Sequence, residues 1–414
     1  MSRPGFRRSS ACAAAAGLVF VGCSGIALAA DPEMWGDGGQ VCVPAAGADC
    51  AGVSHKWEAE HHADLSGINL KRARLHGADF QGADLTDANL NGVVLKHADL
   101  DGADLAGSSV RRAKLHFASL DGVNADGANF IGANLAHVYL SGASLRGADF
   151  RRARFDNAEV SNSDFSSVTS KARVASRNDV VDKSNMQESR WVSTRVKGSD
   201  FTGANMAGSF FKDSTFDDVD FTSVNLSGST FEGDNYFFAG TNFYRANLSN
   251  SVISQATFRS MNGNVGGINL DGIRLTGDTG NFSSVPSPVV YRVVNKTSAG
   301  NIVINMTTGN WRRTTNDYGL GPGESSYFWV TDSDGGKSGA ALTGWVDGLA
   351  IDTYLGSAFT NNLLTWNGQE VSFNSGSKDT ASTQFTSGSR SYKIDVQYLA
   401  EEKRYRVDLI IGDN

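Results

Sequence analysis

The sequence contains little proline, and most of its length contains none. Only six of the 414 residues are proline, and none lies between 45 and 285. Proline cannot donate a backbone hydrogen bond, so it is largely excluded from the interior of strand ladders. The proline-free stretch therefore favours continuous backbone pairing, and the prolines beyond it suggest domain boundaries. The six positions are Pro4, Pro32, Pro44, Pro286, Pro288 and Pro322.

Histidine is also scarce and unevenly placed. All seven histidines precede residue 138, so the C-terminal part has no histidine-based catalytic site. The sequence shows no Ser–His–Asp arrangement for nucleophilic catalysis. No internal stretch reaches the roughly 18 consecutive apolar residues that a membrane-spanning helix needs. These absences argue against a standard hydrolase triad and against an internal membrane-spanning helix.

The first 29 residues have the pattern of a bacterial signal peptide. A positive start (Arg3, Arg7, Arg8) precedes an apolar stretch at 11–21, and small residues at Ala27 and Ala29 form a cleavage site. The pattern predicts export to the periplasm or the medium. A buried helix is the structural alternative. Cys23 follows Phe20-Val21-Gly22, a loose lipobox, so a lipoprotein anchored at Cys23 is a second alternative.

Removal of residues 1–29 would change the formal charge from −7 to about −10, because that segment carries three arginines and no acid. A chain this acidic is unsuited to general nucleic-acid binding. Cys42 and Cys50 would then be the two remaining cysteines, and an oxidising compartment favours a disulfide between them. The nearby His55, His61 and His62 give no familiar metal-ligand spacing.

A period of five residues dominates the centre of the chain. Every fifth residue from 65 to 165 is apolar, the residue two before it is usually small, and the residue just before it is often Asp or Asn. The apolar series is Leu65, Leu70, Leu75, Phe80, Leu85, Leu90, Leu95, Leu100, Leu105, Val110, Leu115, Leu120, Ala125, Phe130, Leu135, Leu140, Leu145, Phe150, Phe155, Val160 and Phe165.

Neither a helix, with a period of 3.6, nor a strand, with a period of 2, explains this pattern. It requires a chain that turns a corner at each repeat, with one large and one small side chain inside. The tract resembles the pentapeptide-repeat family, whose consensus is Ala-(Asp/Asn)-Leu-x-x. The resemblance implies a right-handed, four-sided β-helix with four repeats per coil and coils about 4.8 Å apart.

The register breaks near Ser170 and returns one residue out of phase. A further slip and a final pair complete the second series, which is Met186, Trp191, Val196, Phe201, Met206, Phe211, Phe216, Phe221, Leu226, Phe231, Tyr236, then Phe243, Leu248, Ile253 and Phe258, then Leu270 and Leu275. The predicted organisation is a signal peptide (1–29), an N-terminal cap or linker (30–62), a first repeat block (63–170), a basic loop (171–185), a second block (186–280), a linker (281–288) and a further domain (289–414).

The segment 289–414 has a different composition. Short strand-like runs alternate with Gly, Ser, Asn and Asp clusters, which predicts an antiparallel β-sandwich and an all-β protein throughout. The expected strands are Val289–Val294, Ile302–Met306, Ser326–Val330, Trp345–Tyr354, Leu363–Trp366, Tyr392–Tyr398 and Tyr405–Ile411. No family is identified for this domain.

Three outward patterns are candidates for binding in the first block, because residues 20 apart share a face. A basic stripe for a polyanion is predicted at Lys71, Arg72, Arg74, Arg111, Arg112, Lys114, Arg151, Arg152 and Arg154. A histidine column for a metal or a pH-sensitive contact is predicted at His76, His97, His116 and His137. An acidic face that could orient the protein on a charged partner, or favour pairing of two copies, is predicted at Asp79, Asp99, Asp101, Asp121 and Glu159. Each pattern is also compatible with an ordinary solvated surface.

The C-terminal domain offers weaker candidates. Trp311, Trp329, Trp345 and Trp366 could stack on sugar rings or fill the core. A carboxylate pair for glycoside hydrolysis could be drawn from Glu324, Asp332, Asp347 and Asp352, although nothing singles one out.

The sequence therefore predicts an exported, non-enzymatic binding or scaffold protein without a cofactor. Its β-helix would present the sandwich to an envelope component, glycan or protein. A secreted hydrolase and a toxin-like membrane-active protein are the alternatives. Relatives in the family mimic DNA and protect gyrase, a function that a signal peptide and basic rungs argue against.

Overall fold

The computed structural model describes residues 42–54, 63–166, 184–238, 240–261, 263–277, 289–308, 313–315, 318–330, 340–355, 362–373, 380–399 and 404–414, all within one compact unit. The predicted signal peptide, Cys23, most of the basic loop and the linker at 281–288 lie outside these residues.

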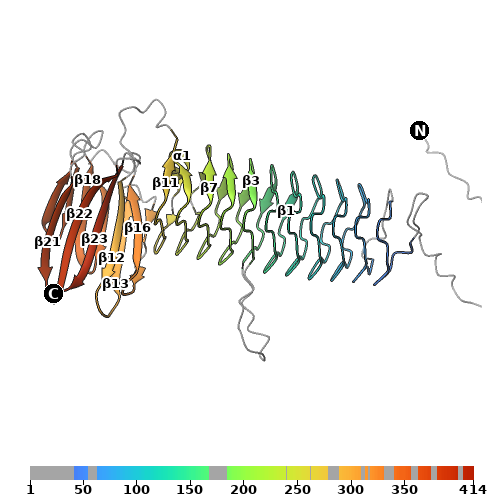
Figure 1. The fold of residues 1–414 in the computed structure, drawn as a ribbon, viewed down its shortest axis with the longest axis horizontal. Coiled ribbons are helices and arrows are strands. Elements are labelled where there is room, and N and C mark those ends of the chain that lie inside the picture. The colour runs from blue at the N-terminus through green and yellow to red at the C-terminus, as the bar shows by residue number, and fades with distance from the viewer. Residues whose placement is uncertain are drawn as a thin grey trace, which may run out of the picture. The chain divides into compact units, whose positions relative to one another are not determined.

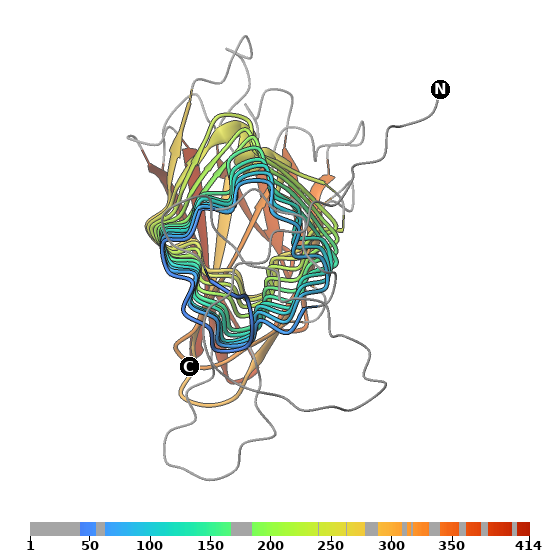
Figure 2. The ribbon, with the colours of Figure 1, turned by 90° about the vertical axis from the view of Figure 1, so that its right-hand side faces the viewer.

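The repeat tract forms a β-helix in which each coil pairs with the next (Figures 1 and 2). In the first block, up to its last coil, each residue of the ladder bridges the residue 20 positions on, as Asp49 bridges Asn69 and Asn69 bridges Asn89. Backbone bonds such as Leu65 N–H to Asp84 C=O, at 2.8 Å, repeat from coil to coil. The period of five thus gives four sides per coil, as the resemblance implied.

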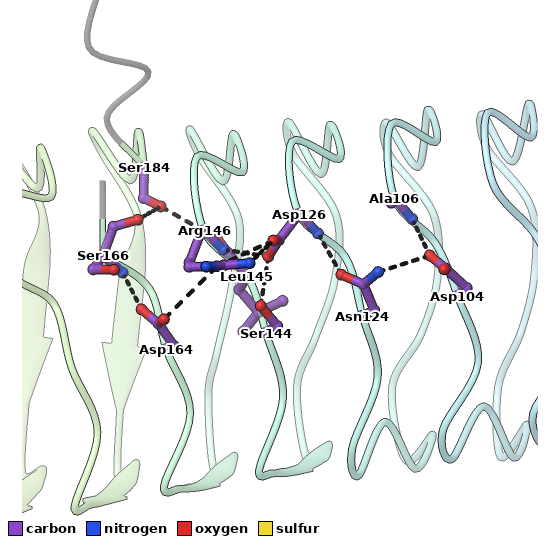
Figure 3. Close-up of polar contacts among 10 residues, drawn as sticks. All are labelled: Asp104, Ala106, Asn124, Asp126, Ser144, Leu145, Arg146, Asp164, Ser166 and Ser184. Atoms are coloured by element: carbon purple, nitrogen blue, oxygen red, sulfur yellow. Dashed lines mark hydrogen bonds and ion pairs between the residues drawn. The ribbon is translucent and has the colours of Figure 1, made fainter. Parts of the chain in front are cut away.

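The three consensus positions each have a physical task. The large fifth residues and the small residues two before them are buried against each other, as Leu105 and Ala103 illustrate. The Asp or Asn between them accepts the backbone N–H two residues later, as Asp104 does from Ala106 at 2.9 Å (Figure 3). Asn124 Nδ2 also donates to Asp104 Oδ1 in the previous coil at 3.0 Å. This residue therefore closes the corner and links coils.

Parallel three-residue strands become regular towards the second block. One sheet has the order β1-β2-β4-β6-β8 and another β11-β9-β7-β5-β3. One short helix, α1 (Gln255–Ser260), is N-capped by Ser254. The strands are β1 (Tyr139–Ser141), β2 (Glu159–Ser161), β3 (Arg190–Val192), β4 (Arg195–Lys197), β5 (Phe210–Lys212), β6 (Thr215–Asp217), β7 (Thr230–Glu232), β8 (Tyr236–Phe237), β9 (Val252–Ser254), β10 (Gly263–Asn264) and β11 (Arg274–Thr276).

Two repeat boundaries and one inward position differ from the prediction. Residues 42–54 already form part of a coil, with Cys50 and Val53 buried in the core, rather than a separate cap or linker. Ser184 and Asn185 belong to the second block, since Asn185 bridges Asn205. Phe237, not Tyr236, is the inward residue. An extra residue before it lets buried Asn235 accept the Ser214 N–H at 3.1 Å, which turns Tyr236 outward.

The C-terminal segment forms two packed sheets. One has the order β14-β13-β17-β18-β19-β20, with β10 of the β-helix added beside β14, and the other has the order β16-β12-β23-β22-β21; β15 also pairs with β13. Most pairs are antiparallel, but β12 and β23 run parallel, as do β10 and β14. The strands are β12 (Val289–Lys296), β13 (Ile302–Thr308), β14 (Arg313–Thr314), β15 (Tyr318–Leu320), β16 (Ser325–Val330), β17 (Ala340–Val346), β18 (Leu349–Leu355), β19 (Asn362–Trp366), β20 (Gln369–Phe373), β21 (Ala381–Ser387), β22 (Arg390–Leu399) and β23 (Arg404–Asp413).

The predicted single strand at Trp345–Tyr354 is wrong. It is a hairpin of β17 and β18, whose turn residues Asp347 and Gly348 have φ values of 55° and 74°. Asp-Gly with two positive φ angles is a typical two-residue hairpin turn. The strand-forming residues on both sides hid this turn in the sequence pattern.

The last coils of the β-helix pack directly against the sandwich. β10 pairs in parallel with β14, and Phe258 of α1 stacks on Trp329 with ring centroids 4.8 Å apart. Tyr327 donates a hydrogen bond to Asp271, and this contact and burial raise the pKa of Tyr327, with burial the larger cause. The sandwich thus covers coil edges that would otherwise expose unpaired backbone groups.

Candidate functional site: a basic face of the β-helix

Two outward columns of the first block carry alternating pairs of cations. In the 20-residue register, Lys71-Arg72 lies beside Asn91-Gly92 of the next coil, and Arg111-Arg112 lies beside Ile131-Gly132 of the coil after its own. All four of these cationic side chains are exposed. Basic rungs therefore recur every second coil, about 10 Å apart at twice the strand spacing.

Glycine in the alternate coils makes room for the arginine stems. Arg72 and Arg112 have positive φ angles of 59° and 56°. A Cβ atom on Gly92 would lie 3.6 Å from Arg72 Cγ, and one on Gly132 would lie 3.6 Å from Arg112 Cγ. The arginine stems therefore lie along the axis, over the glycine of the next coil, and leave the guanidinium groups at the surface.

The face carries no acid across four coils. The segments 69–74, 89–94, 109–114 and 129–134 contain neither Asp nor Glu, and their other polar residues are Asn and Ser. Within the described part of the chain, the cations of this face have no ion-pair partner. We call this surface the basic face; its six cations are Lys71, Arg72, Arg74, Arg111, Arg112 and Lys114.

The third predicted rung is different, because its charges are neutralised. Arg151 Nη2 lies 2.7 Å from Asp149 Oδ2, and Arg152 Nε lies 2.6 Å from Glu188 Oε2. Arg154 makes a similar pair with Asp156 at 2.7 Å. A hollow of about 310 Å³ lies where this neutralised rung meets the basic face, lined by Arg111, Ile131, Arg151, Arg152, Gln187 and Glu188. The stripe is thus shorter than the sequence predicted.

Residues 61–92, 88–124, 128–166 and 197–233 match the family model of pentapeptide repeats, with eight copies. The repeat tract is a pentapeptide-repeat β-helix. HetL, a pentapeptide repeat protein involved in heterocyst differentiation regulation from the cyanobacterium Nostoc sp. strain PCC 7120, is 20% identical over 51% of this chain and 85% of HetL, with a TM-score of 0.29.

QnrB1, a plasmid-mediated fluoroquinolone resistance protein, is 17% identical over 54% of this chain and 94% of QnrB1, with a TM-score of 0.26. No curated protein matches the sequence. Pentapeptide-repeat proteins are generally non-enzymatic scaffolds or interaction proteins. In the described residues, no helix is both long enough and apolar enough to cross a membrane.

The predicted column of four histidines on the pentapeptide-repeat β-helix is interrupted by a phenylalanine. Phe117 lies between His97 and His137, stacked on them with ring centroids 5.0 and 4.4 Å away. His76 meets His97 edge-on at 5.5 Å. Since residues 97, 117 and 137 share one outward column, an apolar ring occupies the place of a ligand. No group of three His, Cys, Asp or Glu residues suited to a metal occurs among the described residues.

His116 sits beside this stack, in the neighbouring column. Burial, followed by the positive charge of Lys96 and the nearby histidines, lowers its pKa. His116 therefore resists protonation next to the basic face. The contacts of the histidines are those of an aromatic ladder on the surface of the pentapeptide-repeat β-helix.

The predicted acidic face largely serves the ladder between coils. Asp101 Oδ1 accepts hydrogen bonds from Ser119 Oγ and Asp121 N–H, and Asp121 Oδ1 accepts the Ser141 N–H at 2.7 Å. Glu159 pairs with Arg195 at 3.1 Å. Asp79 and Asp99 bridge each other along the same side. The backbone and side-chain bonds give these acids a structural task.

The predicted tryptophans and carboxylates of the sandwich differ in their exposure and in their hydrogen-bond partners. Trp329 and Trp366 are buried, whereas Trp345 is 56% exposed. Trp311 and Asp332 lie outside the described residues. Glu324 accepts the Gly321 N–H, and Asp347 is held by Arg390 and Tyr392. Asp347 therefore joins the two sheets.

The two remaining cysteines lie in the first part-coil. Cys42 and Cys50 are joined by a disulfide, with Cα atoms 5.4 Å apart. Cys50 occupies an inward position of the five-residue register and is buried. Ala48-Asp49-Cys50 has the repeat pattern, so the sequence already carried the signal that this segment belongs to the pentapeptide-repeat β-helix.

Proposed function

We propose that this is an exported, non-enzymatic binding protein whose pentapeptide-repeat β-helix holds an acidic polysaccharide of the cell envelope along its basic face. The observation that carries the proposal is the acid-free surface with six cations over four coils, in a chain whose net charge is −7. An unbalanced cluster of this kind concentrates a polyanion near the surface.

The spacing of the rungs favours a sparsely charged polymer. The paired cations recur about every 10 Å along the axis. Double-stranded DNA carries one charge per roughly 1.7 Å of its axis, which is far denser. A polysaccharide with one carboxylate per disaccharide has its charges much farther apart, and a linear chain can lie along the straight column. A lipopolysaccharide phosphate cluster offers compact rather than periodic charge.

The direct contacts between the last coils and the sandwich support a scaffold role. Asp271 of the β-helix accepts a hydrogen bond from Tyr327 and lies 4.0 Å from Arg292 Nη1. Arg292 Nη2 in turn lies 2.9 Å from Asp408 Oδ2. A joint with stacked rings and ion pairs fixes the sandwich on the β-helix. A polymer bound along the basic face would thus hold the sandwich at a set place.

The proposal is tested by binding hyaluronan oligosaccharides to the full chain at several salt concentrations. A plot of log K against log salt is expected to have a clearly negative slope, because salt screens the attraction between the basic face and the carboxylates. Dextran, which is uncharged, is expected not to bind, and duplex DNA is expected to bind more weakly than hyaluronan. A slope near zero, or a preference for DNA, contradicts the proposal.

Export is tested separately by expressing the full sequence in a bacterium and sequencing the N-terminus of the mature chain. Cleavage after Ala29 would leave Ala30 first, in the periplasm or medium. An acylated Cys23 would identify the lipoprotein instead. An intact chain in the cytosol would disprove export. The Cys42–Cys50 disulfide supports an oxidising destination.

A further inference from the structure

A second hollow lies on the outward face of the sheet β16-β12-β23-β22-β21. It has a volume of about 600 Å³, within the range of roughly 300–1,000 Å³ for small-ligand sites. Burial alternates along β22, where Tyr392 and Ile394 face the core and Lys393 faces outward. Because side chains alternate between the faces of a strand, the outward residues of neighbouring strands share this surface.

The strand register explains the hollow. Lys296 lies opposite Gly412, Gly412 opposite Ser391, and Ser391 opposite Thr386. Gly412, inside this row, therefore has no side chain, whereas Lys296 and Thr386 at the two ends of the row do. In the next row, Ile410 lies opposite Lys393. A glycine between taller neighbours, with an isoleucine beside it, makes an apolar floor with polar walls.

The walls carry a net positive charge. Lys393 Nζ lies 2.6 Å from Asp395 Oδ2, whereas Lys296 has no ion-pair partner among the described residues. The pKa of Asp395 is lowered. Burial raises this pKa, but the hydrogen bonds from Lys393 and Ser382 and the positive charge of Lys296 outweigh that effect. The outward side chain of Gln384, opposite Lys393, adds an amide to the wall.

The strands under the hollow are held in place by packing on the core side of the sheet. Phe385 and Tyr392 stack with centroids 5.0 Å apart, and Trp366 packs edge-on against both. The Tyr392 hydroxyl donates to Asp347 Oδ2 at 2.7 Å, and burial, followed by this contact, raises the pKa of Tyr392 to about 12. A prearranged site loses less entropy when a ligand binds.

We propose that this groove, which we call the Gly412 groove, binds one acidic sugar residue of a glycan. The carboxylate would lie between the ammonium groups of Lys296 and Lys393. Ser391, Thr386 and Gln384 would hydrogen-bond the ring hydroxyls, and the ring would occupy the space above Gly412. The volume and the spread of hydroxyl and amide groups suit a sugar ring better than a lone anion. This inference stands independently of the basic face.

The test is titration calorimetry of the full chain with α-1,4-trigalacturonate and with uncharged α-1,4-galactotriose. The acidic trisaccharide is expected to bind at least tenfold more tightly. Gly412→Leu is expected to abolish that binding because its side chain fills the groove. The φ of Gly412 lies outside the left-handed region, and its Cβ would meet only Ser391 Oγ, at 3.2 Å, so the variant is expected to fold. Lys296→Gln is expected to weaken binding about tenfold.

Matched variants separate the groove from other effects. Lys212→Gln removes one positive charge on the β-helix and is expected to leave binding unchanged. A Lys71→Gln, Arg72→Gln, Arg111→Gln and Arg112→Gln variant removes the competing basic face, and the tight, acid-selective binding that remains in it is assigned to the groove. Equal affinity for both trisaccharides, equal affinity for inorganic phosphate, or full binding by a folded Gly412→Leu variant would each overturn the proposal. Loss of binding in the basic-face variant alone would assign the sugar to that face.

Discussion

Replacing Lys71, Arg72, Arg111 and Arg112 together with glutamine is expected to weaken hyaluronan binding by roughly 30- to 1,000-fold at low salt. Exposed ion pairs contribute about 0.5–1 kcal/mol each, so four of them account for about 2–4 kcal/mol. The slope of log K against log salt should also become shallower, because fewer charged contacts are left for salt to screen. Both values come from one salt series measured by fluorescence anisotropy.

The control removes four positive charges elsewhere on the β-helix. Arg195, Lys197 and Lys212 are exposed or half-buried and paired with acids, and Arg274 is exposed in the last coil. Changing these four to glutamine gives the same net charge as the basic-face variant. Affinity should then fall much less. If the two variants weaken binding equally, only net charge matters and the basic face is not a site.

Replacing Phe201 with alanine is expected to destabilise the β-helix by about 3–5 kcal/mol. Its ring is fully buried and stacks between Phe165 and Phe221, with centroids 4.7 and 5.4 Å away. Trp191 also packs edge-on against it at 5.9 Å. The cavity cannot close, because ladders on all four sides fix the backbone. Urea unfolding followed by circular dichroism measures the change.

The position of Phe201 predicts how unfolding would change as well as by how much. Each coil contacts only its neighbours, so stability is close to a sum over coils and interfaces. A weak coil in the middle should split the unfolding transition into two steps. Phe117→Ala is the comparison, since Phe117 is 46% exposed, and surface changes usually stay within about 0.5 kcal/mol. Equal losses in both variants would contradict the account of the core.

The inward half of the fold could be predicted from the sequence, because each repeat contains its own corner. Leu105 with Ala103 defines an inside, and Asp104 closes the turn through a bond only two residues long. Such local contacts need no knowledge of the rest of the chain. The exception at Tyr236 and Phe237 confirms the reason, since one inserted residue shifted the small buried position to Asn235.

The outward half could be predicted only in part. The 20-residue register correctly placed Lys71 and Arg111 on one face, but it could not supply the partners of the third rung. Arg152 meets Glu188, which lies 36 residues on, because the segment between the two blocks interrupts the count. The position of Phe117 between His97 and His137 follows from the same register, since these residues are 20 apart, but a pattern of histidines alone does not contain it.

The pentapeptide-repeat β-helix and the strand-rich domain after it follow from the order of residues alone, because periodicity and turn chemistry act over a few residues. Which charges remain unpaired, and where a hollow forms, depends on tertiary contacts. Gly412 is unremarkable in the sequence, and it becomes a floor only when β12, β23 and β22 align it between Lys296 and Ser391. Contacts across strands depend on register between distant segments, and local patterns do not encode that register.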